Sequence, residues 1–438
     1  MIPRRMMLLR LAAGAPFLFV QPTLRLTAAA PSARAPFSEQ DDAFLNELER
    51  ATFQYFATCA HPETGLVKDR NRTSGGDGRE VASIAATGFG LTALCIAAER
   101  GWLPQIDALE RARTTLRFLR ERMPQERGFF YHFVNWRTGE REWQCELSSI
   151  DTAILLCGVL TCRQYFRDDA IRQWAGEIYD RVDWAWMMNG GALLSHGWKP
   201  ETGFLKSRWD TYCEHMMLYL LAIGAQKQAI PATAWDAWQR PQFVYAGLRY
   251  ISPREPLFVH QFSHAWFDFR GRRDRHTDYF ENSVQATKAH RAFCATLRRK
   301  FPHFGEDVWG ITASDSRRGY VAWGGPPELG PLDGSLVPAA AGGSLPFLPA
   351  ESLRCLRTLR ARFGSQAWTR YGFADAFNPA DGWVAPDVIG INAGITLLMA
   401  ENARTAFVWK TFMKNPQVLS AMEKVGFHTV NAVTQARP

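Results

Sequence analysis

Glu214 is an acidic residue in a segment whose sequence predicts burial. In SRWDTYCEHMMLYLLAIG (207–224), Asp210, Glu214 and Leu221 fall on one face at helical spacing, and the rest of that face is apolar. Asp210 is the expected N-cap, because its side chain can accept a hydrogen bond from the first turn. Opposing the helix dipole is an alternative role for an acid at a helix start. An inward-facing carboxyl group can also exchange a proton with a bound molecule, so Glu214 is the first candidate for proton transfer.

Two further acids lie at the start of another predicted helix, in CELSSIDTAILL (145–156). Ser148 and Asp151 have the spacing of a capping box with Asp in place of Glu, so a structural role for Asp151 stays open beside a catalytic one. Glu146 precedes the cap and has no such role. If these acids meet Glu214, one carboxyl group can protonate a leaving oxygen while another group activates water. That is the chemistry of glycosidic bond cleavage.

Tryptophans beside glycine, aspartate or histidine in predicted loops form a third group. Aromatic rings among polar side chains are how proteins hold sugars, because the C–H faces of a sugar stack on the ring while its hydroxyls form hydrogen bonds. The segment HQFSHAWFDFRG (260–271) has the same character, although His264 is equally explained as a structural hydrogen-bonding residue. Five of the 16 tryptophans favour a carbohydrate ligand: Trp209, Trp266, Trp309, Trp323 and Trp383.

A repeat of about 70 residues indicates which elements position these side chains. HPETGLVKDR (61–70) returns as KPETGFLKSR (199–208), and another Thr-Gly pair lies between them at 138–139. Apolar segments rich in small residues follow most of these loops and predict buried helices, and amphipathic segments such as 106–123 lie between them. The apolar segments are 81–99, 148–166, 211–225, 281–297 and 387–401.

Alternating apolar and amphipathic helices are typical of a two-layered helical ring. We therefore expect an all-α fold, an (α/α)6 toroid with six inner and six outer helices, because an open solenoid should turn polar in its terminal repeats. A strand-containing insertion within 240–345 stays open. Parallel inner helices bring their N-terminal ends to one mouth, where polar residues would gather. They are Asp69, Asp151, Glu214, Asn282 and Asp387.

The first 35 residues differ in composition from the rest of the chain. Arg4 and Arg5 precede a weak apolar stretch and then small residues, without any acidic residue, which is the order of a twin-arginine export signal. A membrane anchor or amphipathic helix is the alternative, but the apolar run is shorter than the roughly 20 residues of a span. We expect residues 1–35 to be an export signal, residues 36–438 to form one catalytic domain, and the protein to be periplasmic or secreted without stable membrane insertion.

Charge and cysteine content restrict the partners. The formal net charge is +8, and five arginines of the first 35 residues account for 5 of it, which leaves 8 − 5 = +3. So small a charge makes no nucleic-acid footprint. The eight cysteines fall mostly in apolar helical segments, where free buried thiols are expected, and no spacing indicates zinc. We expect a monomer without metal or other cofactor, whose partner is an oligo- or polysaccharide.

Seven segments spread from about residue 40 to the C-terminus together resemble one known family. They are TGLVKDR, SIAATGFGLTALCIAAERGW, SSIDTAILLCGVL, WDTYCEHMMLYLLAIG, HQFSHAWFDFR, WGITASDSRRGYVAWG and IGINAGITLLMAENARTAFVWKTFM. In this set the chain is similar to the bacterial endo-β-1,2-glucanases of glycoside hydrolase family 144 and its clan. The resemblance implies an (α/α)6 barrel, no metal cofactor, inversion, and cleavage of β-1,2-glucan to β-1,2-gluco-oligosaccharides.

The resemblance also implies roles for residues. It places the general acid on Glu214 and a second acidic site residue on Glu146. Where the family has Ile-Asp-Gln-Gly in its last inner helix, this chain has Asn392, and an amide accepts no proton at neutral pH. If that Asp is the base in the relatives, Asp151 or Glu146 is expected to activate water here. The expected substrate-binding residues are Asp69, Arg70, Trp209, Tyr212, His264, Trp266, Asp268, Asn282, Trp309, Asp315, Tyr320, Trp323, Trp383, Asp387 and Asn392.

Several alternatives stay open beside endo-acting hydrolysis. A transglycosylase would use the same acid, and a hydrolase of a sibling family would differ in its base or in the glucan linkage. A polysaccharide lyase on the same ring would abstract a proton with tyrosine or histidine. A non-catalytic glycan-binding protein would account for Asn392.

Overall fold

Four helices of the protein are buried on nearly all sides. They are α2 (Ile84–Glu99), α4 (Ser149–Tyr165), α7 (Met216–Gly224) and α12 (Gly390–Thr405). Their sequences consist mostly of apolar and small residues, so they have no continuous polar face to place in water. The computed structural model describes residues 37–254 and 256–430, so the predicted export signal lies outside the described residues. Four of the five predicted apolar segments are confirmed as buried helices.

A second set of helices buries one face each. These are α1 (Glu39–Thr58), α3 (Gln105–Glu121), α5 (Asp169–Asp180) and α11 (Pro349–Ala367). In α3 the apolar stripe that includes Ala112, Leu116 and Leu119 is buried, while the charged residues between them face water. Of the helices in the described part of the chain, none is both long and apolar enough to cross a membrane.

α9 (Tyr279–Thr296) corrects one expectation. The sequence predicts a helix over 281–297 that is buried all round, but α9 exposes a face that includes Lys288. Charged side chains keep that face in water, so the helix is confirmed and its inner position is wrong. The buried segment at this point of the chain is instead the preceding pair of 3-10 helices, η1 (Leu257–His260) and η2 (Phe262–Ala265).

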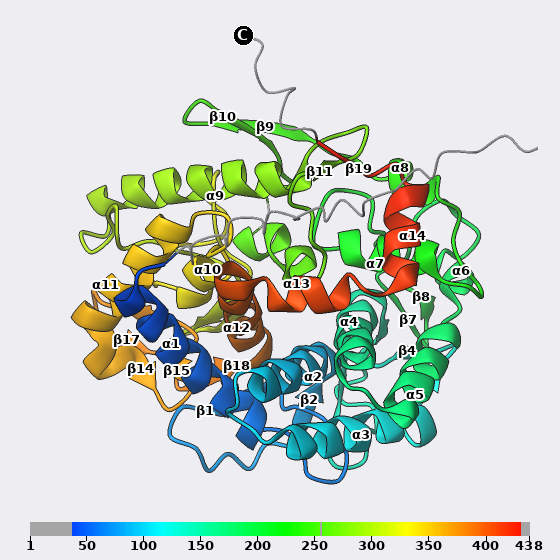
Figure 1. Cartoon of the computed structure of the whole chain (residues 1–438). Helices are drawn as coiled ribbons and strands as arrows, with labels where there is room; N and C mark the ends of the chain where they lie inside the picture. The colour runs from blue at the N-terminus through cyan, green and yellow to red at the C-terminus, as the bar shows by residue number, and fades with distance from the viewer. Residues whose placement is uncertain (1–36, 255, 431–438) are drawn as a thin grey trace, which may run out of the picture. The chain divides into compact units, whose positions relative to one another are not determined.

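α2 is central to the helix packing. It lies between α4 and α12, while α1 packs along α12 and α7 packs against α4 (Figure 1). The backbones of α2 and α4 meet at glycines, because a Cβ atom on Gly158 would lie 2.1 Å from the backbone oxygen of Gly88. A Cβ on Gly88 would lie 2.4 Å from the backbone oxygen of Ile154. The small residues of the apolar segments therefore allow backbone contact between buried helices.

Short antiparallel strands join the loops that lead into the buried helices. β1 (Arg70–Arg72) pairs with β18 (Asp387–Ile389), which runs directly into α12. β2 (Val81–Ser83) runs into α2 and pairs with β5 (Phe133–Asn135). Each loop satisfies its backbone hydrogen-bonding groups on its neighbour, so the loops lie side by side at one end of the helices. A further sheet leads into α4 and consists of β6 (Leu147–Ser148), β7 (Gly197–Lys199) and β8 (Gly203–Phe204).

The fold is helix-rich, which confirms that part of the expected class, and the strands correct the expectation of an all-α chain. Two hairpins lie within 240–345, where a strand-containing insertion stayed open. They are β9 (Gln242–Tyr245) with β10 (Leu248–Ile251), and β12 (Ser314–Ser316) with β13 (Gly319–Val321). The other elements are α6 (Trp184–Met187), α8 (Ala234–Ala237), α10 (Pro338–Gly342), α13 (Phe407–Phe412), α14 (Pro416–Lys424), η3 (Leu297–Arg299), β3 (Gln125–Glu126), β4 (Phe129–Phe130), β11 (Arg272–Arg273), β14 (Trp368–Thr369), β15 (Gly372–Phe373), β16 (Phe377–Asn378), β17 (Trp383–Val384) and β19 (His428–Thr429).

Candidate active site

A cavity of about 360 Å³ opens where the loops before α2, α4, α7 and α12 meet. Five predicted site residues line it: Asp69, Arg70, Asp151, Glu214 and Tyr320. The sequence did not single out the remaining lining residues: Ser83, Ala85, His132, Phe133, Trp143, Ile150, Ile154, Phe258, Phe262, Ile389 and Ile391. Carboxyl groups beside apolar and aromatic walls suit a ligand that has both hydroxyls and C–H faces.

Glu214 reaches this cavity from the turn that precedes α7. α7 begins at Met216, so Glu214 lies just before the helix and not in its first turn. The N-cap position belongs to His215, and Asp210 is an exposed residue, so the predicted cap is wrong. Ser263 Oγ donates to the backbone oxygen of Glu214 at 2.5 Å, which anchors the turn on η2. The Cys213 thiol donates to the Glu214 carboxyl group.

His132 lies between two of the predicted acids. Its Nδ1 is 3.0 Å from Oε1 of Glu146, and its Nε2 is 3.6 Å from Oδ2 of Asp151. Ser148 Oγ donates to Asp151 Oδ2 at 2.5 Å and accepts from the Asp151 backbone N–H at 3.2 Å, so the capping interaction is present as well. Asp151 therefore both closes the first turn of α4 and lines the cavity.

The charged groups of this cluster shift the pKa values of their neighbours. Burial alone would lower the pKa of His132, but the carboxylates of Asp151, Glu146 and Asp69 outweigh it and raise that pKa. The hydrogen bond from His132 in turn lowers the pKa of Glu146 against the effect of burial. His132 and Glu146 therefore shift each other's pKa in opposite directions, each favouring the charged form of the other.

Arg70 connects two other predicted residues. Its Nε donates to Asp69 Oδ2 at 3.0 Å and its Nη1 donates to Asp315 Oδ1 at 2.7 Å. Burial raises the pKa of Asp315, and the Arg70 guanidinium opposes that shift. Asp387, on β18, accepts from both Nη atoms of Arg79 at 2.7 and 2.8 Å. These arginines hold the predicted carboxylates of the β1–β18 ribbon in place.

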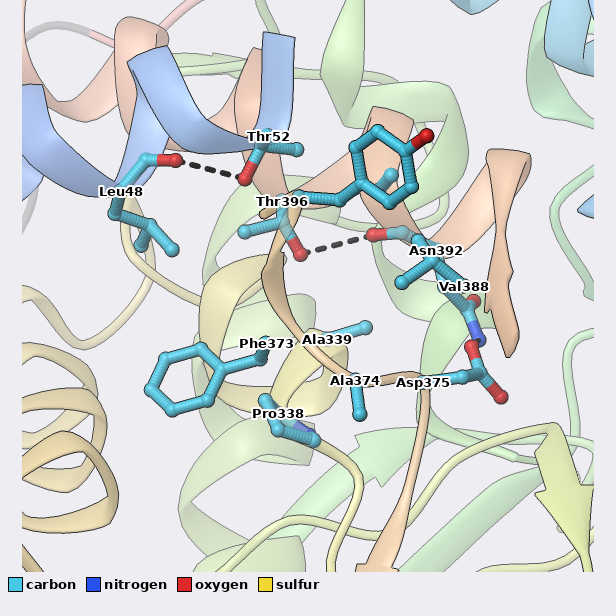
Figure 2. Close-up of a pocket in the computed structure, with 12 residues that line it drawn as sticks. Leu48, Thr52, Pro338, Ala339, Phe373, Ala374, Asp375, Val388, Asn392 and Thr396 are labelled. Atoms are coloured by element: carbon cyan, nitrogen blue, oxygen red, sulfur yellow. Dashed lines mark hydrogen bonds between the residues drawn. The ribbon is translucent and has the colours of Figure 1, made fainter. Parts of the chain in front are cut away.

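Asn392 is hydrogen-bonded to a buried acid that the sequence did not single out. Its Nδ2 donates to Asp375 Oδ1 at 2.8 Å and to the backbone oxygen of Ala313 at 3.1 Å. Asp375 Oδ2 accepts from the backbone N–H of Asp315 at 2.7 Å. Burial raises the pKa of Asp375 to about 7. Asn392 and Asp375 both line a separate small cavity of about 30 Å³ (Figure 2).

Most of the predicted tryptophan platforms are buried. Trp266 and Trp309 have no exposed surface and Trp323 has 2%. Trp266 Nε1 donates to Thr92 Oγ1 and Trp323 Nε1 to Ser314 Oγ, so these rings are fixed in the interior. A ring enclosed by core side chains cannot stack on a ligand, and the expectation for these three is wrong.

The other two predicted tryptophans also lie outside the set that lines the cavity. Trp209 is buried, stacks on His196 at 3.9 Å between ring centroids, and donates from Nε1 to Ser149 Oγ at 2.9 Å. Trp383 is half-buried on β17. The exposed aromatic rings at the cavity are Trp143, 64% exposed, and Tyr320, 49% exposed. Trp143 lies in a loop and has a backbone φ of 53°, in the left-handed region. The sequence did not single it out, because a backbone angle cannot be read from composition.

Four predicted binding residues have structural contacts instead. Tyr212 is buried with its hydroxyl 3.2 Å from Nδ1 of His260. His264 Nε2 lies 3.0 Å from Ser283 Oγ, and burial lowers the pKa of His264 to about 3, so it is neutral. Asn282 holds both backbone groups of a residue in β10, and Asp268 pairs with Arg270. None of these four lines the cavity in the described structure, because each side chain is committed to its neighbours.

Sequence comparisons connect the chain with known proteins. The model of a family described as "Putative glucoamylase" matches residues 206–416. The chain is 28% identical, over an alignment of 428 residues, to the exo β-1,2-glucooligosaccharide sophorohydrolase (non-reducing end) of Parabacteroides distasonis. That match covers 88% of this chain but 58% of the relative, so the chain spans little more than half of the relative's length.

Solved structures also show similarity to β-1,2-glucanases. The endo-β-1,2-glucanase of Chitinophaga pinensis, solved with sophorotriose and glucose, superposes with a TM-score of 0.82 at 27% identity, covering 89% of this chain and 99% of that one. A β-1,2-glucanase of P. distasonis gives a TM-score of 0.81 at 27% identity, covering 89% and 60%. A Talaromyces funiculosus endo-β-1,2-glucanase, at 11% identity, TM-score 0.59 and coverages of 88% and 92%, shares the fold alone.

Proposed function

We propose that this protein, a relative of the bacterial β-1,2-glucan-active glycoside hydrolases, is an endo-acting hydrolase. It would cleave internal linkages of β-1,2-glucan and release β-1,2-gluco-oligosaccharides. Glu214 would act as the general acid in an inverting mechanism. The observation that carries the proposal is that Glu214, from the turn before α7, lines one cavity together with Asp151, from the first turn of α4. The substrate class follows from the sophorohydrolase of P. distasonis and the endo-β-1,2-glucanase of C. pinensis, which both act on β-1,2-linked glucose chains.

Glu214 supplies the proton to the leaving oxygen. Its backbone is anchored by Ser263, and its carboxyl group borders the cavity, so the proton it carries can reach a glycosidic oxygen bound there. Protonation of that oxygen is needed because an alkoxide is a poor leaving group. The carboxylate formed would be reprotonated from solvent after each cleavage.

Asp151 activates the attacking water. Asn392 cannot take a proton from water, since an amide is not basic at neutral pH. Asp151 borders the cavity, and His132 lies 3.6 Å from its carboxylate. The other nitrogen of His132 lies 3.0 Å from Glu146, so the ring is held between the two acids and can keep the Asp151 carboxylate in place beside the cavity. The water would then attack the anomeric carbon from the side opposite to the leaving oxygen.

The substrate would lie between the exposed aromatic rings and the charged loop. Trp143 and Tyr320 offer ring faces to the C–H surface of glucose units, and Arg70 and Asp69 offer hydrogen bonds to hydroxyls. The named relatives include an exo-acting and an endo-acting enzyme. We assign the endo mode, so products of several lengths should appear early in the reaction.

The decisive measurement is a substrate screen with the purified chain. Linear and cyclic β-1,2-glucans are compared with β-1,3- and β-1,4-glucans, and the product lengths and the anomer first released are recorded. Hydrolysis of the cyclic glucan, mixed short products and inverted anomers are expected. Release of one disaccharide alone from linear chains would replace the endo assignment, longer or re-cyclised products would indicate transglycosylation, and an unsaturated product would indicate a lyase.

Glu214→Gln is the variant that tests the role of Glu214 as the general acid. The amide keeps the size of the side chain but carries no transferable proton, so hydrolysis of β-1,2-glucan should fall by about 10³-fold or more. Binding of oligosaccharide and the thermal unfolding temperature should change little. Glu306→Gln, at an exposed glutamate outside the cavity, is the control and should retain full activity. Retention of more than a few per cent of activity in Glu214→Gln would remove it as the acid.

The arrangement of the helices and the cellular location complete the proposal. The buried helices contact one another in the order α12, α2, α4 and α7, while helices with one exposed face lie beside them, which supports an (α/α)6 toroid. Residues 1–35 would direct the protein through the twin-arginine pathway to the periplasm or the medium, where it would act as a monomer.

A further inference from the structure

A second polar cavity, of about 390 Å³, lies beside the candidate active site. Lys68 and Asn71 line this second cavity, whereas Asp69 and Arg70, the residues between them, line the first. The two cavities are thus built on the same short stretch of chain. The other residues of the second cavity come from the end of α1, from the loop 75–78, and from Trp136, Arg370 and Tyr371.

Lys68 is a buried cation with few partners. Its side chain belongs to a residue that is 5% exposed. Its Nζ donates to the backbone oxygen of Asp77 at 2.7 Å and lies 4.3 Å from the centroid of the Trp136 ring. Within the described residues no carboxylate forms an ion pair with it. An ammonium group has three N–H donors and the hydrogen bond to Asp77 uses one of them, so the remaining donors can bind an anion.

Arg370 adds a second cation at the same cavity. It is exposed, lies over the Tyr371 ring at 5.3 Å, and has no ion pair with any described residue. Its Nη1 packs against Gly75, where a Cβ atom would lie 2.8 Å from it, so the glycine makes room for the guanidinium. A planar guanidinium with free N–H groups is suited to two oxygens of one oxyanion.

Asp77 is the only carboxylate that lines the second cavity in the described structure, and Arg79 pairs with it. Asp77 accepts from Nε of Arg79 at 2.9 and 2.7 Å, and hydrogen bonds from Arg79 lower the pKa of Asp77 to about 2 despite its burial. Arg79 also binds Asp387. The cavity therefore presents Lys68 and Arg370, neither of which forms an ion pair with a described residue, together with the Asn71 amide and the Tyr371 hydroxyl.

We propose that this second cavity binds a small oxyanion, of the phosphate or carboxylate kind, between Lys68 and Arg370. The anion would complete the hydrogen bonds of the buried ammonium and bridge it to the guanidinium. Because Asp69 and Arg70 follow directly on Lys68, such an anion lies next to the active-site cavity. It is either a charged substituent of the glucan or a free anion, and only the first source rests on the proposed function.

The test measures binding of inorganic phosphate to the full chain by titration calorimetry at low ionic strength. Binding in the millimolar range or tighter is expected. Arg370→Gln and Lys68→Met should each weaken it at least tenfold, about 1.4 kcal/mol. Arg298→Gln, at an exposed arginine outside both cavities, is the charge-matched control and should bind as the unaltered chain does. Lys68→Met replaces a buried side chain, so thermal unfolding of this variant is recorded to check that it folds. Arg370 is exposed, so Arg370→Gln tests the site without that risk.

The source of the anion is resolved with substrates. A β-1,2-gluco-oligosaccharide with a phosphate ester on C6 is compared with the neutral oligosaccharide. A higher kcat/KM for the phosphorylated substrate that falls to the neutral value in Arg370→Gln assigns the site to a substituent. Phosphate binding without such a preference assigns it to a free anion. Absence of phosphate binding, or binding that neither variant weakens, overturns the proposal, whatever the activity on neutral glucan.

Discussion

At the level of single residues, His132 links the acids of the candidate site. Its ring lies within 4 Å of both Glu146 and Asp151. Its pKa is raised by these carboxylates, and it lowers the pKa of Glu146. Because His132 and Glu146 shift each other's pKa, the pH dependence of activity should report the pair.

His132→Gln should shift the acidic limb of the pH profile. The limb reports protonation of the acid cluster, and loss of the imidazole removes the hydrogen bond that lowers the pKa of Glu146. The limb should therefore move to higher pH, and kcat should fall. The measurement is kcat/KM on β-1,2-glucan from pH 4 to 9. His303→Gln, where the histidine binds the backbone oxygen of Gly334, should leave the profile in place. An unmoved limb in His132→Gln would show that the base lies elsewhere.

Asp375 should make stability depend on pH. Its folded pKa of about 7 lies above the ordinary value of 3.8, so between these limits the folded state holds a proton that the unfolded state has lost. The stabilisation is complete below about pH 4 and is lost as pH rises to about 7, a change on the order of 4 kcal/mol. Asp375→Asn cannot titrate, so in urea unfolding at a series of pH values its stability should lack this fall. A fall of the same size in the variant would refute the assignment to Asp375.

The sequence singled out site residues when local pattern carried the signal. Glu214 and Asp151 precede apolar helical runs, and Asp69 and Arg70 lie in a repeated loop, so all four were found. His132 and Asp375 were missed because their roles come from contacts with residues that are near only in the fold. The prediction that the tryptophans stack on a sugar was wrong for another reason. A neighbouring glycine or aspartate indicates a loop but not whether the ring points into the core.

At the scale of elements, the glycine contact between α2 and α4 is the feature that fixes the cavity wall. Gly88 and Gly158 bring the two helix backbones together. Ala85 on α2 and Ile154 on α4 line the active-site cavity. A change in the helix separation would therefore change the cavity.

Gly158→Ala tests this contact. The new methyl group would lie 2.1 Å from the backbone oxygen of Gly88, so the helices must separate, and the free energy of unfolding should fall by about 2 kcal/mol despite the better helix propensity of alanine. Gly176→Ala in α5 is the matched control, because no atom lies within 4 Å of its Cβ position. It should gain up to about 1 kcal/mol in urea unfolding. Equal effects of the two substitutions would mean that the helix contact is not tight.

Element type was predictable for long runs and layer position was less so. The continuous apolar runs of α2, α4 and α12 left no face for water. α9 mixes small apolar residues with lysine and arginine, and only the structure shows that its charged residues share an exposed face. The short strands were not predicted because their pairing joins loops that are distant in the chain.

At the scale of the whole molecule, the predicted export signal can be tested directly. Replacing both Arg4 and Arg5 by lysine should keep the charge but block twin-arginine export, so the protein should stay in the cytoplasm. Cell fractionation and activity on β-1,2-glucan in each fraction measure the outcome. Replacing Arg25 and Arg34 by lysine is the control and should leave export unchanged. Export of the Arg4/Arg5 variant at the unaltered rate would contradict the twin-arginine assignment.

The pairing of β1 with β18 has a kinetic consequence. Arg70 pairs with Ile389, and the N–H of Gly390 donates to the backbone oxygen of Asp69 at 2.7 Å, so two site residues are held by the start of α12. Contacts between residues so distant along the chain form slowly, because a long loop must close before they are made. A refolding chain thus acquires its helices before it acquires its site. Recovery of activity after dilution from denaturant should follow the slowest phase, well behind the return of helical signal.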